Sequence, residues 1–198
     1  TAGGLAPTGA AADGEVEDYA LGLLGVDLGD APNSYATTLA SNGPSHAVVA
    51  GFSLGATVDS EPDGQPSIGA TGDGADEDGI ALPPGGAFVA CTTAPISVTL
   101  TNTAAVVTPR LDAWIDFDGD GAFNDPRDRV ATGFALASGA NLLNVAVPCN
   151  VPSVPTYARF RLSSGGIATP GGPAANGELE DYAVGVFGLD YGDLPDPT

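Results

Sequence analysis

An acidic loop with glycines at fixed positions carries the strongest chemical signal of this sequence. It reads Asp116-Phe117-Asp118-Gly119-Asp120-Gly121. Carboxylates at alternating positions, with glycine at the sixth, let a backbone bend around a hard cation, and the seventh residue adds a carbonyl oxygen. The calcium ligands that this pattern predicts are Asp116, Asp118, Asp120 and the carbonyl of Ala122, with Asp125 or Asp128 closing the loop.

The loop departs from an EF-hand in two respects. Arg127 stands at the twelfth position, where an EF-hand places a bidentate glutamate. The flanking helices are also missing, because Leu111 to Ile115 has the pattern of a strand and Pro126 interrupts the segment after the loop. We therefore expect a calcium loop between strands, and the alternative is a solvated Asp/Gly turn.

A second acidic motif, Glu-x-Glu-Asp-Tyr, occurs at both ends of the chain. On a strand, Glu178, Glu180 and Tyr182 share one face, and so do Glu15, Glu17 and Tyr19. Two carboxylates on one edge need a balancing charge. Either calcium supplies it, or Arg159 and Arg161 on a preceding strand pair with Glu178 and Glu180.

A third group of acids lies in glycine-rich turns of the first half. Asp73, Asp76 and Asp78 stand within one short loop, and Asp59, Glu61 and Asp63 precede them. Asp27 and Asp30 form a turn that recurs as Asp190 and Asp193. These turns add further candidate calcium ligands: Asp73, Asp76, Asp78, Asp27 and Asp30.

Charge excludes some partners and favours others. The chain has 25 acidic residues against five arginines, it has no lysine, and its net charge is −20. Such a surface repels nucleic acid and anionic membranes, and no stretch approaches the ~18 apolar residues of a membrane span. The acids fall in a few clusters, which favours bound cations over a generally solvated acidic surface of the kind seen in halophilic or secreted proteins.

Two cysteines complete the inventory of reactive groups. Cys91 and Cys149 lack the spacing of a zinc or redox motif. An even count in a chain with extracellular character favours one disulfide between them, and two separate buried thiols are the alternative.

The elements that must position these residues are short strands. Alternating apolar residues between Gly, Pro, Asn and Asp predict strands, and 29 Gly and 17 Pro leave no room for long helices. We expect an all-β fold, an antiparallel β-sandwich resembling a jelly roll, with a short helical turn at residues 36–40. The predicted strands are 19–24, 88–90, 96–101, 111–117, 130–135, 141–147, 157–162 and 182–187. Residues 26–80 have few strand signals, and calcium is expected to pin them.

An internal repeat suggests how the chain is organised. Gly14 to Ala20 matches Gly177 to Ala183, and the matches continue to Pro32 and Pro195 at one constant offset of 163 residues. We expect one period of a tandem array. Residues 1–25 then end a preceding repeat or form an exchanged strand, 26–187 form one repeat, and 188–198 start the next.

Several of these motifs together resemble the GEVED domain, found in tandem in large secreted bacterial surface and adhesin-like proteins. The residues that carry the resemblance are 14–19, 177–182, 27–32, 59–66, 76–79 and 114–121. The resemblance implies an extracellular, β-rich module in a structural or adhesive setting, at the bacterial cell surface, and implies no enzyme activity.

The function expected from the sequence is a structural, calcium-stabilised repeat of an extracellular filament, stalk or adhesin. Its partners would be copies of itself or adjacent repeats, with a cell-surface or glycan target. A carbohydrate-binding module is the alternative, although Trp114 sits mid-strand, where core packing is favoured. A glycoside hydrolase would need one distinguished carboxylate pair, and none stands out. His46 lies in a Pro/Ser loop, which favours an anchor over a catalytic base.

Overall fold

The computed structural model describes residues 9, 13–14, 25–74 and 76–190, and it consists almost entirely of strands and loops. In chain order the strands are β1 (Val26–Leu28), β2 (Ser45–Ala47), β3 (Phe52–Leu54), β4 (Ile80–Ala81), β5 (Ala87–Val89), β6 (Thr93–Asn102), β7 (Arg110–Ile115), β8 (Arg129–Ala135), β9 (Gly139–Ala146), β10 (Val154–Ser163), β11 (Pro173–Ala174) and β12 (Glu178–Phe187). Three short 3₁₀ turns, η1 (Asn33–Tyr35), η2 (Leu39–Ser41) and η3 (Pro84–Gly86), complete the fold.

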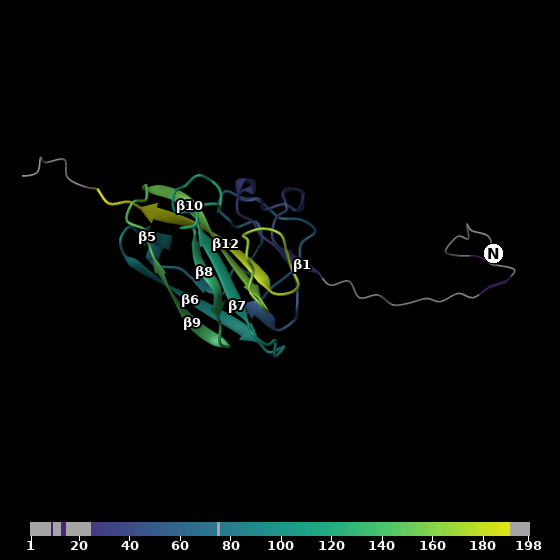
Figure 1. Cartoon of the computed structure of the whole chain (residues 1–198). Coiled ribbons are helices and arrows are strands. Elements are labelled where there is room, and N and C mark those ends of the chain that lie inside the picture. The colour runs from purple at the N-terminus through teal and green to yellow at the C-terminus, as the bar shows by residue number, and fades with distance from the viewer. Residues whose placement is uncertain (1–8, 10–12, 15–24, 75, 191–198) are drawn as a thin grey trace, which may run out of the picture.

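Two sheets form a sandwich, as the strand pattern predicts. One sheet has the order β5-β12-β10-β7-β8, and the other has β3-β6-β4 with β9 also paired to β6. Most neighbouring strands are antiparallel, but β5 runs parallel to β12. A third, small sheet, β1-β2-β11, lies beside the sandwich. Figure 1 shows β1 at one end of the sandwich and β5 near the other.

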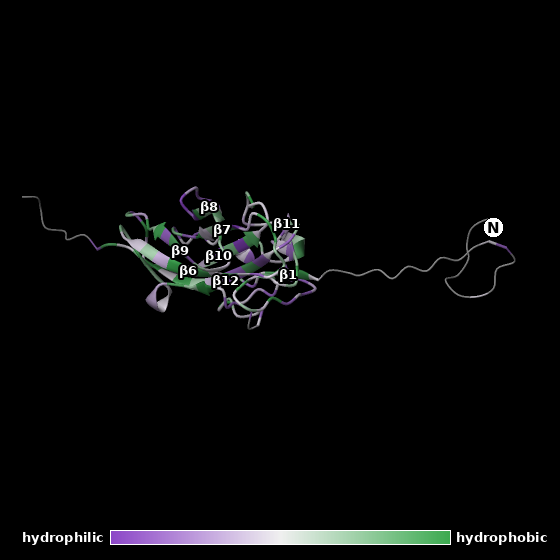
Figure 2. Cartoon of the chain, turned by 90° about the horizontal axis from the view of Figure 1, so that it is seen from below, coloured by the Kyte–Doolittle hydropathy of each residue, from purple (hydrophilic) through white to green (hydrophobic). Residues whose placement is uncertain are grey.

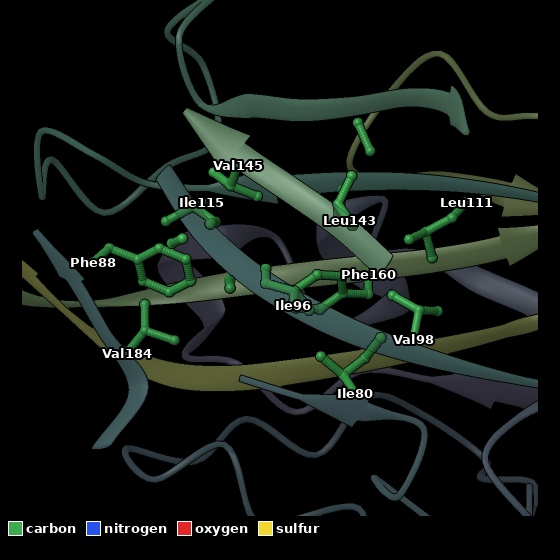
Figure 3. Close-up of a cluster of buried hydrophobic side chains, with 14 of the residues drawn as sticks. Ile80, Phe88, Ile96, Val98, Leu111, Ile115, Leu143, Val145, Phe160 and Val184 are labelled. Atoms are coloured by element: carbon green, nitrogen blue, oxygen red, sulfur yellow. The ribbon is translucent and has the colours of Figure 1, made fainter. Parts of the chain in front are cut away.

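The hydrophobic core lies between the two larger sheets. Along β6, Ala94, Ile96, Val98 and Leu100 are buried and alternate with more exposed residues, which is the period-two pattern of a strand with one face inward. The facing sheet contributes Phe160 and its neighbours, and Figure 3 shows these side chains meeting between the strands. The alternation that predicted the strands therefore also builds the core.

The long predicted strands agree with the structure, with shifts at their ends. Residues 96–101, 130–135, 157–162 and 182–187 lie inside β6, β8, β10 and β12. β12 begins four residues earlier than predicted, because the acidic run Glu178–Asp181 is paired with β10 along its whole length. Two 3₁₀ turns flank residues 36–38 in place of one helical turn at 36–40. The predicted strand 19–24 lies outside the described residues.

Residues 26–80 form a layer of loops, short strands and turns over one end of the sandwich. A small cluster of Ala31, Tyr35, Trp114 and Phe123 packs this layer against the five-stranded sheet, on the face that points away from the main core. Figure 2 shows hydrophilic segments gathered in the loops beside β1 and β12, whereas hydrophobic stretches follow β6 and β9. One acid of this layer, Asp27 on β1, lies against the start of β12, where its Oδ2 accepts the amide of Leu179.

A disulfide joins Cys91 and Cys149, which confirms the predicted bond. It links the turn between β5 and β6 to the segment after β9. Within the part of the chain that the structure describes, no helix has the length and apolar character needed to cross a membrane.

Candidate metal centre

The Asp116 loop connects the end of β7 to the chain leading to β8. Asp116 is fully buried, and both of its oxygens accept backbone hydrogen bonds, Oδ1 from Gly119 at 2.7 Å and Oδ2 from Gly121 at 3.0 Å. Gly119 and Gly121 have φ angles of 71° and 89°, which L residues rarely adopt. The glycines of the motif therefore allow the loop to close around the first aspartate. The hydroxyl of Tyr35 also donates to Asp116 Oδ2, at 2.7 Å.

The structure brings three of the predicted loop ligands together. One oxygen each from Asp116, Asp118 and Asp120 lies within 4.8 Å of the others. Burial, and then the charges of the other two aspartates, raise the pKa of Asp118. Two oxygens that each sit about 2.4 Å from one calcium ion are at most about 4.8 Å apart, so this spacing suits a single ion.

Asp125 and Asp128, the residues expected to close the loop, are engaged by partners other than the three aspartates. Asp125 forms a two-pronged ion pair with Arg127, whose Nε and terminal nitrogen donate at 3.0 Å. Asp128 is buried and accepts amide hydrogen bonds from Phe117 and Asp125, and burial raises its pKa to about 6. The amide of Ala122 donates to Asp120 at 2.9 Å. These contacts make Asp125 and Asp128 supports of the loop in this arrangement.

A second acidic group is far more deeply buried and lies where β1 meets the start of β12. We call it the buried acid cluster: Asp27, Asp59, Glu61, Asp73 and Asp76. Asp59 is exposed, but the exposed fractions of Asp27, Asp73, Asp76 and Glu61 are only 0%, 4%, 7% and 8%. These four side chains converge from three parts of the chain: Asp27 comes from β1, Glu61 from the chain after β3, and Asp73 and Asp76 from the chain before β4.

The buried acid cluster has carboxylate oxygens that accept no hydrogen bond. They are Asp27 Oδ1, Glu61 Oε1, Asp73 Oδ1 and Asp76 Oδ1, and Asp30 Oδ1 and Glu178 Oε1 nearby share this property. Buried polar atoms are normally paired, since leaving one unpaired costs free energy of about 1–3 kcal/mol or more for a charged group. A cation is the natural partner for such a set of oxygens.

The pKa values of these acids are raised, first by burial and then by the negative charges of their neighbours. Burial raises the pKa of Asp27 well above its usual value, and the charges of Asp73 and Glu61 add to the effect. Burial first, then the neighbouring Asp59 and Asp73, raise the pKa of Glu61 to about 9. Burial and the charges of Asp76 and Asp30 raise the pKa of Asp73 to about 8. These raised pKa values favour either protonation of the cluster or the binding of cations near neutral pH.

The two glutamates of β12, Glu178 and Glu180, lie close enough to each other for their charges to interact, and Glu178 also interacts with Asp27 of the buried acid cluster. Glu178 has no arginine partner among the described residues: its Oε2 accepts the amide of Leu54, and its Oε1 is the unpaired oxygen noted above. Burial, then the charges of Glu180 and Asp27, raise the pKa of Glu178 to about 11. Glu180 accepts hydrogen bonds from the amide of Gly79 at 2.8 Å and from the hydroxyl of Tyr182 at 3.0 Å.

The predicted ion pairs of Arg159 and Arg161 with these glutamates are wrong. Arg159 lies opposite Asp181 in the β10–β12 ladder, so its side chain points to the face that Asp181 occupies, away from Glu178 and Glu180. Nε and a terminal nitrogen of Arg159 donate to Asp181, each at 2.8 Å, and both residues are fully buried.

Arg161 has a neutral partner. It donates to His46 Nε2 at 3.0 Å and to three backbone carbonyls, while His46 Nδ1 lies 3.2 Å from the carbonyl of Asn176. Burial, and then the charge of Arg161, lower the pKa of His46 to about 3. His46 therefore stays neutral and serves as an anchor between β2 and β10, the structural role that the sequence favours.

The remaining predicted calcium ligands are Asp30, Asp78, Glu15 and Glu17. Asp30 lies beside the buried acid cluster, where its Oδ2 accepts the amide of Gly72 at 2.6 Å. Asp78 is exposed, and its Oδ1 accepts the amide of Ala56 at 2.8 Å. Glu15 and Glu17 lie outside the described residues.

The ligand set predicted from the sequence omits some participants. Asp59 and Glu61 stand upstream of the 73–78 loop in the sequence, yet they join it in space. Glu77 is also absent from the predicted set; its Oε1 accepts the amide of Asp181 at 3.1 Å, and burial together with Asp30 and Asp181 raises its pKa to about 11. The signal that could have found them is their position in the same glycine-framed acidic turns.

Comparisons with known proteins give one positive finding. Neither curated proteins nor solved structures yielded a match to this chain. Residues 110–185 match the family model described as the GEVED domain. The match runs from the start of β7 almost to the end of β12, so it includes the Asp116 loop and the Glu-x-Glu-Asp-Tyr motif of β12. The chain is therefore similar to the GEVED domain over residues 110–185, which make up less than half of its length.

Proposed function

We propose that this chain is a structural repeat module, stabilised by calcium, of an extracellular bacterial filament, stalk or adhesin. The observation that carries the proposal is the buried acid cluster, whose inward oxygens accept no hydrogen bond. Carboxylate oxygens suit calcium, which takes six to eight oxygen ligands in flexible geometry. The cluster joins turns that have little regular structure of their own, so bound ions would hold the 26–80 layer on the sandwich.

Arginine cannot supply this charge balance. All of the ion pairs among the described residues use Arg127, Arg129 or Arg159, and their partners are Asp118, Asp125, Asp112 and Asp181. None of these acids belongs to the buried acid cluster. No arginine ion pair among the described residues therefore balances the cluster, and a bound cation is the counter-charge that we propose.

The extracellular setting rests on the disulfide and the family. A bond between Cys91 and Cys149 suits an oxidising compartment. Calcium is also available at high concentration outside cells, where even sites of about 10⁻⁴–10⁻³ M affinity are occupied. These points support a secreted module at the cell surface.

End-to-end assembly is supported by where the chain enters and leaves. β1 and the end of β12 lie at opposite ends of the sandwich (Figure 1). Beside the end of β12 lies an apolar hollow of about 280 Å³, lined by Ser153, Val154, Pro155, Gly185, Val186 and Phe187. Phe187, which lines the hollow, is 49% exposed, and Leu189, two residues further along the chain, is 43% exposed. We assign this hollow to contact with an adjoining copy or repeat.

The carbohydrate-binding alternative loses its best candidate residue. Trp114 is only 3% exposed, packs in the small cluster with Tyr35 and Phe123, and stacks under Arg129 at 5.4 Å. It cannot serve as an open platform for a sugar ring. The acidic residues are accordingly assigned to metal binding, with no catalytic reaction proposed.

Metal removal tests the calcium part of the proposal. After chelation and dialysis, adding calcium should raise the Tm by many degrees, because an ion at about 1,000 times its Kd stabilises the fold by about 4 kcal/mol. Magnesium at equal concentration should do much less, since it demands small octahedral sites. Equal Tm values with and without calcium would overturn the proposal.

Assembly needs a separate test. Electron microscopy of the assembled protein should show successive modules meeting at the Phe187 hollow, and Phe187→Asp should disrupt that contact. Leu142→Asp is the matched control, because Leu142 is 60% exposed on β9 and does not line the hollow. Side-by-side contacts, or equal effects of the two substitutions, would contradict end-to-end assembly.

A further inference from the structure

Two groups of oxygens in the buried acid cluster share one residue. In the first group, oxygens from Asp27, Glu61 and Asp73 all lie within 4.8 Å of one another. In the second, oxygens from Asp59, Glu61 and Asp76 do the same. Each group has the spread expected of ligands around one calcium ion, since oxygens about 2.4 Å from a common ion are at most about 4.8 Å apart. Glu61 belongs to both.

Three of the five carboxylates, those of Asp27, Glu61 and Asp76, are each held by one oxygen. Asp27 Oδ2 accepts the amide of Leu179 at 2.6 Å, and Glu61 Oε2 accepts the amide of Leu28 at 3.0 Å. Asp76 Oδ2 accepts the amide of Asp59 at 3.3 Å. In all three the second oxygen is buried and accepts no hydrogen bond. One oxygen therefore fixes the side chain, and the other remains available for a ligand.

The charge of the cluster distinguishes two ions from one. Its five carboxylates carry five negative charges when ionised, and no arginine among the described residues pairs with any of them. A single divalent ion would leave three charges unbalanced in a mostly buried volume, where like charges repel strongly. Two divalent ions would leave one, which solvent at the exposed Asp59 can screen.

We propose that the buried acid cluster holds two calcium ions bridged by the carboxylate of Glu61, one with Asp27 and Asp73 and the other with Asp59 and Asp76. This inference rests on the proposed calcium-dependent function and deepens it. The bridge would lock three parts of the chain together: β1 through Asp27, the chain after β3 through Asp59 and Glu61, and the chain before β4 through Asp73 and Asp76. Carbonyl oxygens and water would complete each coordination shell.

Counting bound ions tests the bridge. The full chain carrying Asp118→Asn, which disables the Asp116 loop, is loaded with calcium, and native mass spectrometry with equilibrium dialysis gives the stoichiometry. Two ions per chain are expected. Adding Glu61→Gln should remove both, whereas adding Asp73→Asn or Asp59→Asn should each remove one.

Asp63→Asn is the matched control, because Asp63 lies in the same turn as Asp59 but in neither group. It should leave the count at two. Asp59→Asn keeps the test informative if a buried variant fails to fold, since Asp59 is exposed, and circular dichroism checks the fold of each variant.

The outcomes separate the two proposals. A count of one ion in the Asp118→Asn background, or loss of only one ion on Glu61→Gln, would overturn the bridge and leave the calcium-stabilised module intact. A count of zero there, together with a Tm indifferent to calcium in the unsubstituted chain, would overturn both.

Discussion

The guanidinium of Arg159 and the carboxylate of Asp181 form a buried, two-pronged pair between β10 and β12. Asp181 Oδ2 also accepts the amides of Asp30 and Ala31, at 3.2 and 3.0 Å. Arg159 in turn donates to the carbonyl of Tyr35 at 3.0 Å. This single pair therefore fastens the 26–80 layer to the central strands.

Asp181→Asn should destabilise the protein strongly. Removing one member of a buried ion pair leaves the other charge uncompensated, which typically costs about 3–5 kcal/mol. The measurement is the free energy of unfolding in urea at saturating calcium. Asp125→Asn is the comparison, because it breaks the exposed pair with Arg127, and its effect should be far smaller. Equal losses in the two variants would contradict the importance assigned to Asp181.

Gly29→Ala should loosen the layer at the point where it touches β12. A Cβ at Gly29 would clash with Asp181 Oδ2 and lie 2.5 Å from Leu179 Cδ2, so the segment between Asp27 and Asp30 would have to move. Overpacking of this kind costs about 1–3 kcal/mol. Calcium affinity, measured by calorimetry, should fall as well. Gly165→Ala is the control, since a Cβ there meets no atom within 4 Å.

His46 makes stability fall on mild acidification. Its pKa in the folded protein is lowered to about 3, by burial first and then by Arg161, against about 6.5 in an unfolded chain. A lowered pKa means that the unfolded state binds the proton more readily. The contribution is therefore complete above about pH 6.5 and is lost as pH falls from there towards 3.

The His46→Gln variant lacks this titration. Between about pH 7 and pH 5.5 the unsubstituted protein should lose about 1 kcal/mol more than the variant. Urea unfolding at both pH values in saturating calcium measures the difference. Parallel curves for the two proteins would show that His46 does not titrate on unfolding.

Removal of the disulfide should cost stability without changing calcium binding. The bond joins residues separated by 58 positions, and a loop of that size corresponds to about 4 kcal/mol in the chain-entropy description. The double variant Cys91→Ser with Cys149→Ser, compared with the oxidised protein by urea unfolding, tests this. Its calcium stoichiometry should be unchanged, because the bond joins the segment after β5 to the segment after β9, and none of the proposed calcium ligands lies in either segment. A lost ion would contradict that separation.

The sandwich strands could be predicted because burial on one face imposes a period of two. Ile96 and Val98 on β6, and Phe160 and Leu162 on β10, show that pattern in the sequence and face the core in the structure. The start of β12 could not be recognised in this way. Glu178 and Glu180 point inward although they are acidic, so hydrophobicity gave no sign of their burial.

The candidate site was predictable only where its ligands are close in sequence. Asp116, Asp118 and Asp120 stand at alternating positions, so their convergence follows from the loop itself. Asp27, Glu61 and Asp73 meet through tertiary folding of separate turns, and spacing along the chain cannot show that. The partner of Arg159 could not be predicted for a related reason: strand register, unknown from the sequence, decides which of Glu180 and Asp181 it faces.

The ladder between β10 and β12 also has a mechanical consequence. It runs without interruption from the pair Leu162 and Glu178 to the pair Val154 and Val186. Since the described chain enters at one end of the sandwich and leaves at the other, tension on a string of such modules would pull along β12, across its hydrogen bonds (Figure 1). In the proposed string of modules, the bonds would share the load in shear and break together, so we expect each module to resist stretching better than a hairpin unzipped from its end.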